Sequence, residues 1–174
     1  MNIVIAMAIS PNGLMAREDG QEDWLPSDNW DDFIVQSKYF GNIVMGRETY
    51  ELVTKLYPDY NFDNVHIDHK VIVTRNTAFK APSNYTVALS PEAAMKYIEN
   101  SGCEEMLLIG GGKLNLEFIK RNLVTHIHLT ITPYIIGIGR PFIAAENFDM
   151  PLELESSQIL SKGRVLLKYK VLQL

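Results

Sequence analysis

An apolar run that ends in three consecutive glycines, Met106-Leu-Leu-Ile-Gly-Gly-Gly-Lys-Leu114, constrains the fold of this chain more than any other segment. The run has the length of a strand, and an amphipathic segment follows it. Glycines at such a junction let the backbone approach a ligand closely and take angles that a Cβ forbids. The free N–H groups at the start of a helix favour an anion. The segment therefore predicts a strand, a tight turn and a helix that together seat a pyrophosphate group.

The composition is typical of one globular domain. The chain has 174 residues, of which 47% are hydrophobic and 21% charged, with a formal net charge of −5. This length suits a single domain, so we expect residues 1–174 to form one unit. The acidic balance disfavours nucleic-acid binding, which needs a basic surface, and no apolar run approaches the about 20 residues of a membrane helix. Cys103 is the only cysteine, which excludes an internal disulfide and favours a reducing, cytoplasmic location.

Strand-like and helix-like segments alternate along most of the chain. Strands are predicted at 2–10, 42–45, 71–74, 85–88, 106–109 and 125–134, and helices at 28–38, 47–56, 91–100 and 114–121, with Ser27 and Ser90 as N-caps of the first and third. A final pair of strands, 152–160 and 164–172, flanks a turn and predicts a hairpin. Residues 57–70 are rich in Pro, Asp and Asn and are predicted to be a loop. The pattern predicts an α/β fold with a mostly parallel central sheet and an antiparallel C-terminal hairpin.

Glycines, hydroxyls and basic side chains follow several of these strands. In open α/β sheets, ligands bind outside the carboxyl ends of the strands. Those ends carry Ser10-Pro-Asn-Gly13, Gly46-Arg-Glu-Thr49, Thr74-Arg-Asn76 and Gly110-Gly-Gly-Lys113. The combination suits a ligand that bears phosphate. The P-loop and the Gly-x-Gly-x-x-Gly fingerprint are both absent, so a different nucleotide-binding fold is expected.

Several of these segments resemble the dihydrofolate reductase-like superfamily. Met45-Gly-Arg-Glu-Thr-Tyr50 is similar to the signature after the second strand of dihydrofolate reductases, and Ile109-Gly-Gly-Gly-Lys-Leu114 is similar to the cofactor motif of that superfamily. Residues 114–142 most resemble the reductase (C-terminal) domain of the bifunctional riboflavin-biosynthesis deaminase–reductase and its stand-alone relatives, with Leu129-Thr-Ile-Thr-Pro133 and Gly137-x-Gly139-x-Pro141-Phe. The resemblance spans nearly the whole chain. It implies a three-layer α/β/α fold and hydride transfer from NADPH.

The resemblance also implies which residues hold NADPH. The diphosphate side would be held by Gly46, Arg47 and Thr49, and the diphosphate itself would lie against Gly110, Gly111 and Gly112. The helix that follows would begin with Lys113 and Leu114. The nicotinamide would contact the backbone of Ala6 and Met7, and Gly13 would belong to the loop that closes over it. Thr74 and Arg75 match the position that meets the adenosine 2′-phosphate. A charged hydrogen bond contributes ~1.5–3 kcal/mol, so one such arginine would favour NADPH over NADH by roughly 10- to 150-fold.

The substrate side rests on an acidic segment. Trp24-Leu-Pro-Ser-Asp28 resembles the dihydrofolate reductase segment whose acid binds the amino-pyrimidine edge of the pterin and assists protonation. Asp28 matches that acid and is the predicted catalytic residue, because a carboxylate can accept two N–H bonds from such an edge. Trp24 and Asn12 are the other predicted substrate contacts. Asn12 stands where the riboflavin branch usually has Asp.

Three hypotheses follow for the function. The leading one is an NADPH-dependent reductase of a pyrimidine or pterin-type substrate, similar to 5-amino-6-(5-phosphoribosylamino)uracil reductases and favoured by residues 114–142. A dihydrofolate reductase is the alternative, favoured by Asp28, and a non-catalytic NADPH-binding protein is the third. A homodimer is expected by analogy and because the predicted strand around 125–136 is long and apolar for a lone edge. Deaminase activity is not expected, since the usual zinc motif needs more than one cysteine, and no metal site is predicted.

Overall fold

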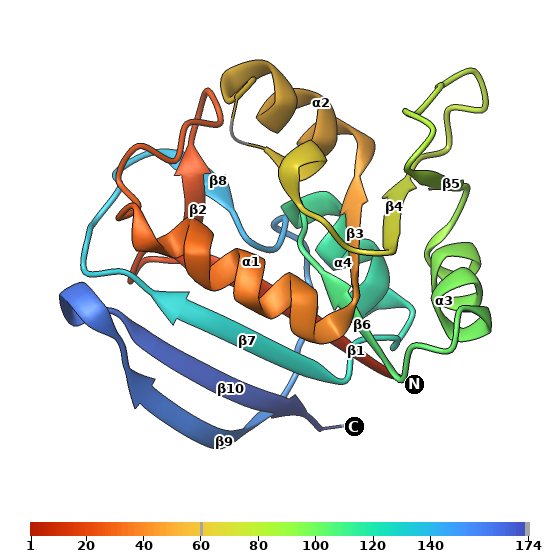
Figure 1. Cartoon of the computed structure of the whole chain (residues 1–174). Coiled ribbons are helices and arrows are strands. Elements are labelled where there is room, and N and C mark those ends of the chain that lie inside the picture. The colour runs from red at the N-terminus through yellow and green to blue at the C-terminus, as the bar shows by residue number, and fades with distance from the viewer. Residues whose placement is uncertain (60, 173–174) are drawn as a thin grey trace.

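The computed structural model describes residues 1–59 and 61–172, and a sheet of eight strands lies at its centre. The strand order is β5 (Thr86–Ala88), β4 (His69–Val73), β3 (Asn42–Gly46), β6 (Glu105–Leu108), β1 (Asn2–Ile9), β7 (His126–Ile131), β10 (Val165–Val171) and β9 (Leu152–Ile159). The first six strands are parallel, while β10 pairs antiparallel with β7 and β9 antiparallel with β10 (Figure 1). The expected parallel sheet with a C-terminal hairpin is confirmed.

Helices cover both faces of the parallel part of the sheet. They are α1 (Asp28–Phe40), α2 (Arg47–Leu56), α3 (Pro91–Asn100) and α4 (Gly112–Lys120). Successive side chains of a strand point to opposite faces, so Ile3 belongs to a core cluster with residues of α3 and α4, and Val4 to a second cluster with residues of α1 and α2. Near-continuous apolar strands are therefore buried on both sides. The three-layer α/β/α fold is confirmed.

The starts of α3 and α1 differ in how well they follow the predicted capping signals. The Ser90 side chain accepts a hydrogen bond from the Ala93 N–H at the start of α3, as predicted. Ser27 precedes α1 but makes no side-chain capping bond, which corrects its predicted role. The first turn of α1 carries Asp28 and Asp31, and acids there interact favourably with the helix dipole.

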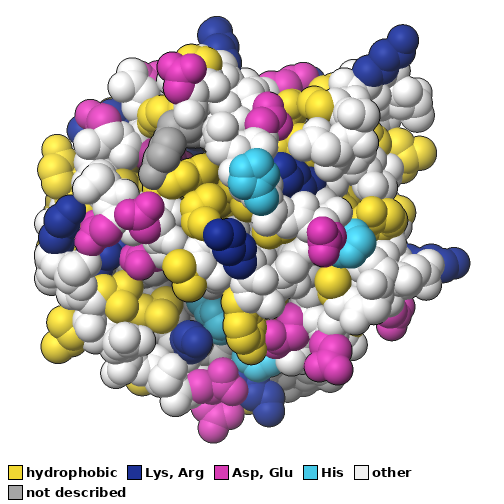
Figure 2. Space-filling view, in the orientation of Figure 1, with side chains coloured by type: hydrophobic (Ala, Val, Ile, Leu, Met, Phe, Trp, Pro, Cys, Tyr) yellow, Lys and Arg dark blue, Asp and Glu magenta, His cyan; other side chains and the backbone are white. Residues whose placement is uncertain are grey.

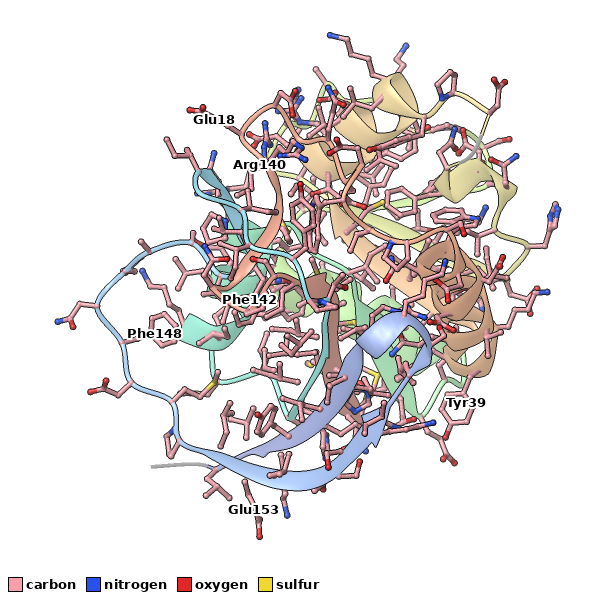
Figure 3. The ribbon with its side chains drawn as sticks, turned by 90° about the vertical axis from the view of Figure 1, so that its left-hand side faces the viewer. Glu18, Tyr39, Arg140, Phe142, Phe148 and Glu153 are labelled. Carbon is pink, nitrogen blue, oxygen red and sulfur yellow. The ribbon has the colours of Figure 1, made fainter. Side chains whose placement is uncertain are left out.

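A small second sheet was not predicted. It pairs β2 (Leu14–Arg17) antiparallel with β8 (Gly139–Pro141), and these strands are too short and too far apart in the chain to leave a hairpin signal. Gly139 is required for their close approach, because a Cβ there would lie 2.3 Å from the Ala16 carbonyl oxygen. Arg140 donates from Nε to the Glu18 carbonyl at 3.0 Å, and the two residues lie side by side in Figure 3. The pairing fixes the loop that follows β2.

Two other expectations need correction. β7 is an interior strand, paired with β1 and with β10, so it is not the lone edge on which part of the argument for a dimer rested. The predicted loop at 57–70 contains a 3-10 turn, η1 (Phe62–Asn64), that buries Phe62 in the core, and β4 begins at His69; Tyr60 lies outside the described residues. No helix in the described ranges is long and apolar enough to cross a membrane.

Candidate active site

A cavity of about 840 Å³ opens along the carboxyl ends of β1, β3, β4 and β6. The strand-end residues that the sequence singled out meet there because parallel strands present their carboxyl ends at one edge of the sheet. Those that line the cavity are Ala6, Met7, Gly46, Arg47, Thr49, Thr74, Arg75, Gly111, Gly112, Lys113 and Leu114. Two predicted cofactor residues, Gly13 and Gly110, are not among the lining residues; Gly110 instead turns with a φ of 94° beside the Met7 side chain.

The glycine turn brings α4 against the cavity. A Cβ on Gly112 would lie 2.4 Å from the Pro141 carbonyl oxygen, and one on Gly111 would lie 3.0 Å from Thr49 Oγ1. The N–H groups of Gly112 and Lys113, in the first turn of α4, have no hydrogen-bond partner within the described residues. Free N–H groups at a helix start beside a hydroxyl form a seat for an anionic group. These residues fit a nucleotide diphosphate.

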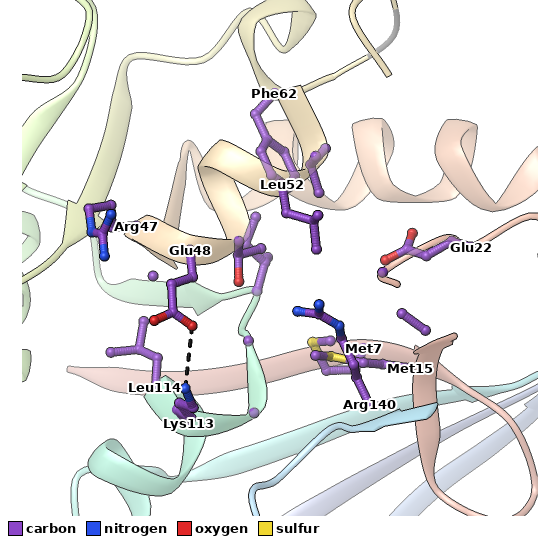
Figure 4. Close-up of a pocket in the computed structure, with 18 of the residues that line it drawn as sticks. Met7, Met15, Glu22, Arg47, Glu48, Leu52, Phe62, Lys113, Leu114 and Arg140 are labelled. Carbon is purple, nitrogen blue, oxygen red and sulfur yellow. Dashed lines mark hydrogen bonds and ion pairs between the residues drawn. The ribbon is translucent and has the colours of Figure 1, made fainter. Parts of the chain in front are cut away.

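The cations at this end of the cavity differ in their partners. Arg47 forms an ion pair with Glu51 at 2.8 Å, and Lys113 pairs with Glu48 at 3.4 Å, a contact drawn as a dashed line in Figure 4. Arg75 follows β4, is exposed and makes no ion pair within residues 1–59 and 61–172. It is therefore a cation whose full charge is available to a ligand.

The opposite end of the cavity is aromatic and aliphatic. Trp30 and Phe33 of α1 have ring centroids 5.0 Å apart, and Phe33 and Phe62 have centroids 6.0 Å apart. Leu52 of α2 and Met15 of β2 complete this part of the lining, and both are labelled in Figure 4. Flat apolar walls of this kind suit a planar ring.

Two charged residues in the aromatic part were missed from the sequence. Glu22, in the loop between β2 and α1, donates its backbone N–H to the Tyr57 hydroxyl at 2.8 Å, and its carboxyl group makes no hydrogen bond or ion pair within the described ranges. Burial raises the pKa of Glu22 to about 7. Arg140 lines the cavity from β8, and Figure 4 shows the Glu22 carboxyl and the Arg140 guanidinium directed into the same open space. Glu22 lay hidden in an acidic run, and Arg140 in a strand that the sequence did not reveal.

The predicted substrate residues lie elsewhere. Asp28 accepts a hydrogen bond from the Ser161 hydroxyl and ion-pairs with Arg164 at 3.1 Å and Lys162 at 3.3 Å; it is not a lining residue. The Ser161 hydrogen bond is the largest of the effects that hold its pKa below the usual value. Trp24 is buried against Tyr134, and Asn12 donates to the Ile136 carbonyl at 2.7 Å. The structure brings none of the three into the cavity.

Fold and site together define a three-layer α/β/α protein with a cavity at the carboxyl ends of its parallel strands. The chain belongs to the RibD C-terminal domain family, whose model matches residues 1–166. It is thus a RibD-type reductase domain, an oxidoreductase by family. Figure 2 shows acidic and basic side chains interspersed on the face it presents, with no basic patch there.

Known proteins are similar to this chain over nearly its whole length. YyaP of Bacillus subtilis (strain 168), an uncharacterized protein, is 24% identical over 96% of this chain and 93% of its own length. A riboflavin biosynthesis protein of Shewanella sp. PV-4 has a TM-score of 0.77 at 18% identity, over 99% of this chain and all of that one.

Two further solved structures share the fold. The Thermotoga maritima diaminohydroxyphosphoribosylaminopyrimidine deaminase/5-amino-6-(5-phosphoribosylamino)uracil reductase has a TM-score of 0.73 at 13% identity, over 98% of this chain and 56% of that one. Enterococcus faecalis dihydrofolate reductase, complexed with NADP(H) and RAB-propyl, has a TM-score of 0.71 at 15% identity, over 99% of this chain and 97% of that one. Both branches named by the sequence resemblance are thus represented.

Proposed function

We propose that this protein is an NADPH-dependent reductase that transfers hydride to a pyrimidine or pterin-type substrate. One observation carries the proposal: the same cavity joins an end with two N–H groups and Arg75, which have no partner among the described residues, to an aromatic end that suits a flat ring. A dinucleotide laid along it would bring its nicotinamide beside a flat heterocycle. For hydride transfer between two such rings, the protein supplies close alignment and exclusion of water.

Each end of the cavity has a proposed role. The N–H groups of Gly112 and Lys113 and the Thr49 hydroxyl hold the diphosphate, and Arg75 meets the 2′-phosphate that distinguishes NADPH from NADH. When bound, NADPH supplies the hydride. Trp30, Phe33 and Phe62 hold the substrate ring and exclude water. The nicotinamide lies between the two ends of the cavity, where it contacts the backbone of Ala6 and Met7.

The leading substrate is a phosphoribosylamino-pyrimidine of the riboflavin pathway. Family membership and the Shewanella and Thermotoga neighbours support it, and Arg140 offers a cation to a phosphate or oxo group at the aromatic end. Dihydrofolate is the second candidate, because Glu22 offers a carboxyl group to an amino-pyrimidine edge. The catalytic role of Asp28, a homodimer and a cytoplasmic location stay predictions.

Absorbance at the nicotinamide band tests the proposal. The protein is mixed with NADPH and, in parallel, with dihydrofolate or with the deaminated pyrimidine intermediate of riboflavin synthesis. Loss of absorbance with the pyrimidine selects the leading substrate, and loss with dihydrofolate selects the second. Tight NADPH binding without turnover of either would favour the non-catalytic alternative, and failure to bind either nicotinamide coenzyme would overturn the proposal.

A further inference from the structure

We propose that Glu22, and not Asp28, is the acid that contacts the substrate ring and donates the proton that accompanies hydride transfer. The inference rests on the proposed reductase function and names the chemistry of its substrate: a planar ring with a basic or imine nitrogen on the side of Glu22 and an oxo or anionic group on the side of Arg140. No motif in the sequence assigns Glu22 this role.

The position of Glu22 in the cavity is the first support for this assignment. Its carboxyl group is directed into the open space beside Leu52 and Met15, across from the Arg140 guanidinium (Figure 4). An apolar slot with one acid and one cation on opposite sides binds a flat ring in one orientation, because each charged group selects a different edge of that ring.

The second support is that the Glu22 carboxyl group has no hydrogen-bond or ion-pair partner among the described residues. The charged or titratable groups around it include Tyr57, whose hydroxyl accepts a hydrogen bond from the Glu22 N–H, Asp19 and Asp23 in its own loop, and Arg140 across the cavity. Arg17 does not compensate Glu22, because it is paired with Asp23 at 2.5 Å. A half-buried carboxyl group without a partner favours its neutral form, and its pKa of about 7 leaves it close to half protonated at neutral pH.

A neutral carboxylic acid can complete the reduction. Bound NADPH would supply a hydride to the carbon of a C=N bond, and the electron pair of that bond would move to the nitrogen. Glu22 would give its proton to that nitrogen, so that the products are oxidised coenzyme, a reduced ring and a glutamate carboxylate that solvent reprotonates. An acid with a pKa near the working pH is the most effective proton donor.

Asp28 has the opposite surroundings. Ser161, Lys162 and Arg164 all contact its carboxylate and favour the ionised form. An ionised carboxylate has no proton to donate at neutral pH. Its partners come from η2 (Ser161–Gly163) and the residue after it, so its contacts join α1 to the C-terminal hairpin instead of reaching a ligand.

The matched variants Glu22→Gln and Asp28→Asn test the assignment, because each keeps the shape of the side chain and removes its charge and its acidity. The first probe is 2,4-diaminopyrimidine, titrated by calorimetry without NADPH at several pH values. We expect Glu22→Gln to lose at least tenfold in affinity relative to the wild type, while Asp28→Asn binds like the wild type. Equal binding by Glu22→Gln and the wild type, or a loss confined to Asp28→Asn, would overturn the inference.

The second measurement is single-turnover reduction of whichever candidate substrate is active. We expect Glu22→Gln to lower the hydride-transfer rate by about 10²- to 10⁴-fold while its Kd for NADPH stays within about twofold. An unchanged rate, or an equal loss in Asp28→Asn, would contradict the assignment. Failure of the wild type to bind NADPH would instead count against the proposed function. In that case the diaminopyrimidine titration would still test whether Glu22 contacts the ring. Thermal unfolding of each variant checks that it folds.

Discussion

At the scale of single residues, the charges around the cavity divide into those already paired and those still available. Arg47 and Lys113 each have a carboxylate partner, so their charge is partly neutralised within the protein. Arg75 makes no ion pair within the described residues, and it follows the buried Thr74 at the end of β4. The cation predicted to meet the 2′-phosphate thus keeps its charge available to a ligand.

We therefore expect Arg75→Ala to weaken NADPH binding by roughly 10- to 150-fold, since a charged hydrogen bond contributes ~1.5–3 kcal/mol, and to leave NADH binding nearly unchanged. Fluorescence titration with each coenzyme measures both Kd values. Lys38→Ala, at the far end of α1, is the control and is expected to change neither. Equal losses for the two coenzymes in Arg75→Ala would remove Arg75 from the 2′-phosphate.

The candidate site was predictable where the register of a strand fixes it. Residues after β3, β4 and β6 meet at one edge because parallel strands end there together, and periodicity reveals such strands. Glu22 could not be found this way, because it lies in a loop without periodicity that is held by the Arg140 contact and by Tyr57. Asp28 shows the opposite case: the local motif predicts a site residue, but Arg164, far away in the sequence, forms an ion pair with its carboxylate.

At the scale of elements, the β2–β8 pair and α4 depend on close backbone contacts. A Cβ on Gly112 would lie 2.4 Å from the Pro141 backbone, which cannot move as a flexible side chain can. We expect Gly112→Ala to lower the free energy of unfolding by about 1–3 kcal/mol, as overpacking does. Gly137→Ala is the control, because nothing lies within 4 Å of its added Cβ. Urea unfolding compares the two, and equal stability would show that β8 does not pack against α4 this closely.

The C-terminal hairpin is attached to α1 through one buried cation. Arg164 is 1% exposed and contacts Asp32 at 2.7 Å and Asp28 at 3.1 Å. We expect Arg164→Met to destabilise the protein by about 2–3 kcal/mol, because hydrogen bonds to charged groups are lost while the volume is kept. Lys162→Met removes a half-exposed partner of the same Asp28 and should cost less than about 1 kcal/mol. A smaller loss in Arg164→Met than in Lys162→Met would contradict this attachment.

The elements themselves were largely predictable, and the reason is their length. Parallel strands that are buried on both faces appear in the sequence as apolar runs. The helix α3 begins at the pattern Ser90-Pro91-Glu92, in which Ser90 is the N-cap. The second sheet was missed because β2 and β8 are short and their pairing joins segments more than a hundred residues apart. The sequence suggested that β7 is an edge strand, because its partner β10 belongs to the C-terminal hairpin and the pairing between them leaves no local signal.

At the scale of the whole molecule, two partly buried ionisable groups give the stability of the fold opposite dependences on pH. Burial first, then Lys168 and His126, lower the pKa of His128 to about 4, so the unfolded chain binds that proton more readily and stability rises with pH up to about 6.5. Glu22 acts in the other direction. Its folded pKa of about 7 lies above the ordinary value of 4.5, so the unfolded chain releases the proton first as pH rises.

The Glu22 contribution is therefore complete below pH 4.5 and is lost as pH rises through about 7. We expect this loss to be on the order of 2 kcal/mol, less than the full shift implies because the side chain is only half-buried. Urea unfolding of the wild type and Glu22→Gln between pH 4.5 and 7.5 measures it: the difference in stability between the two should move steadily in favour of Glu22→Gln as pH rises, while His128 contributes equally to both and cancels. A constant difference across that range would mean that the carboxyl group is ionised in the folded protein, and Glu22 would then be a hydrogen-bond acceptor for the substrate and not a proton donor.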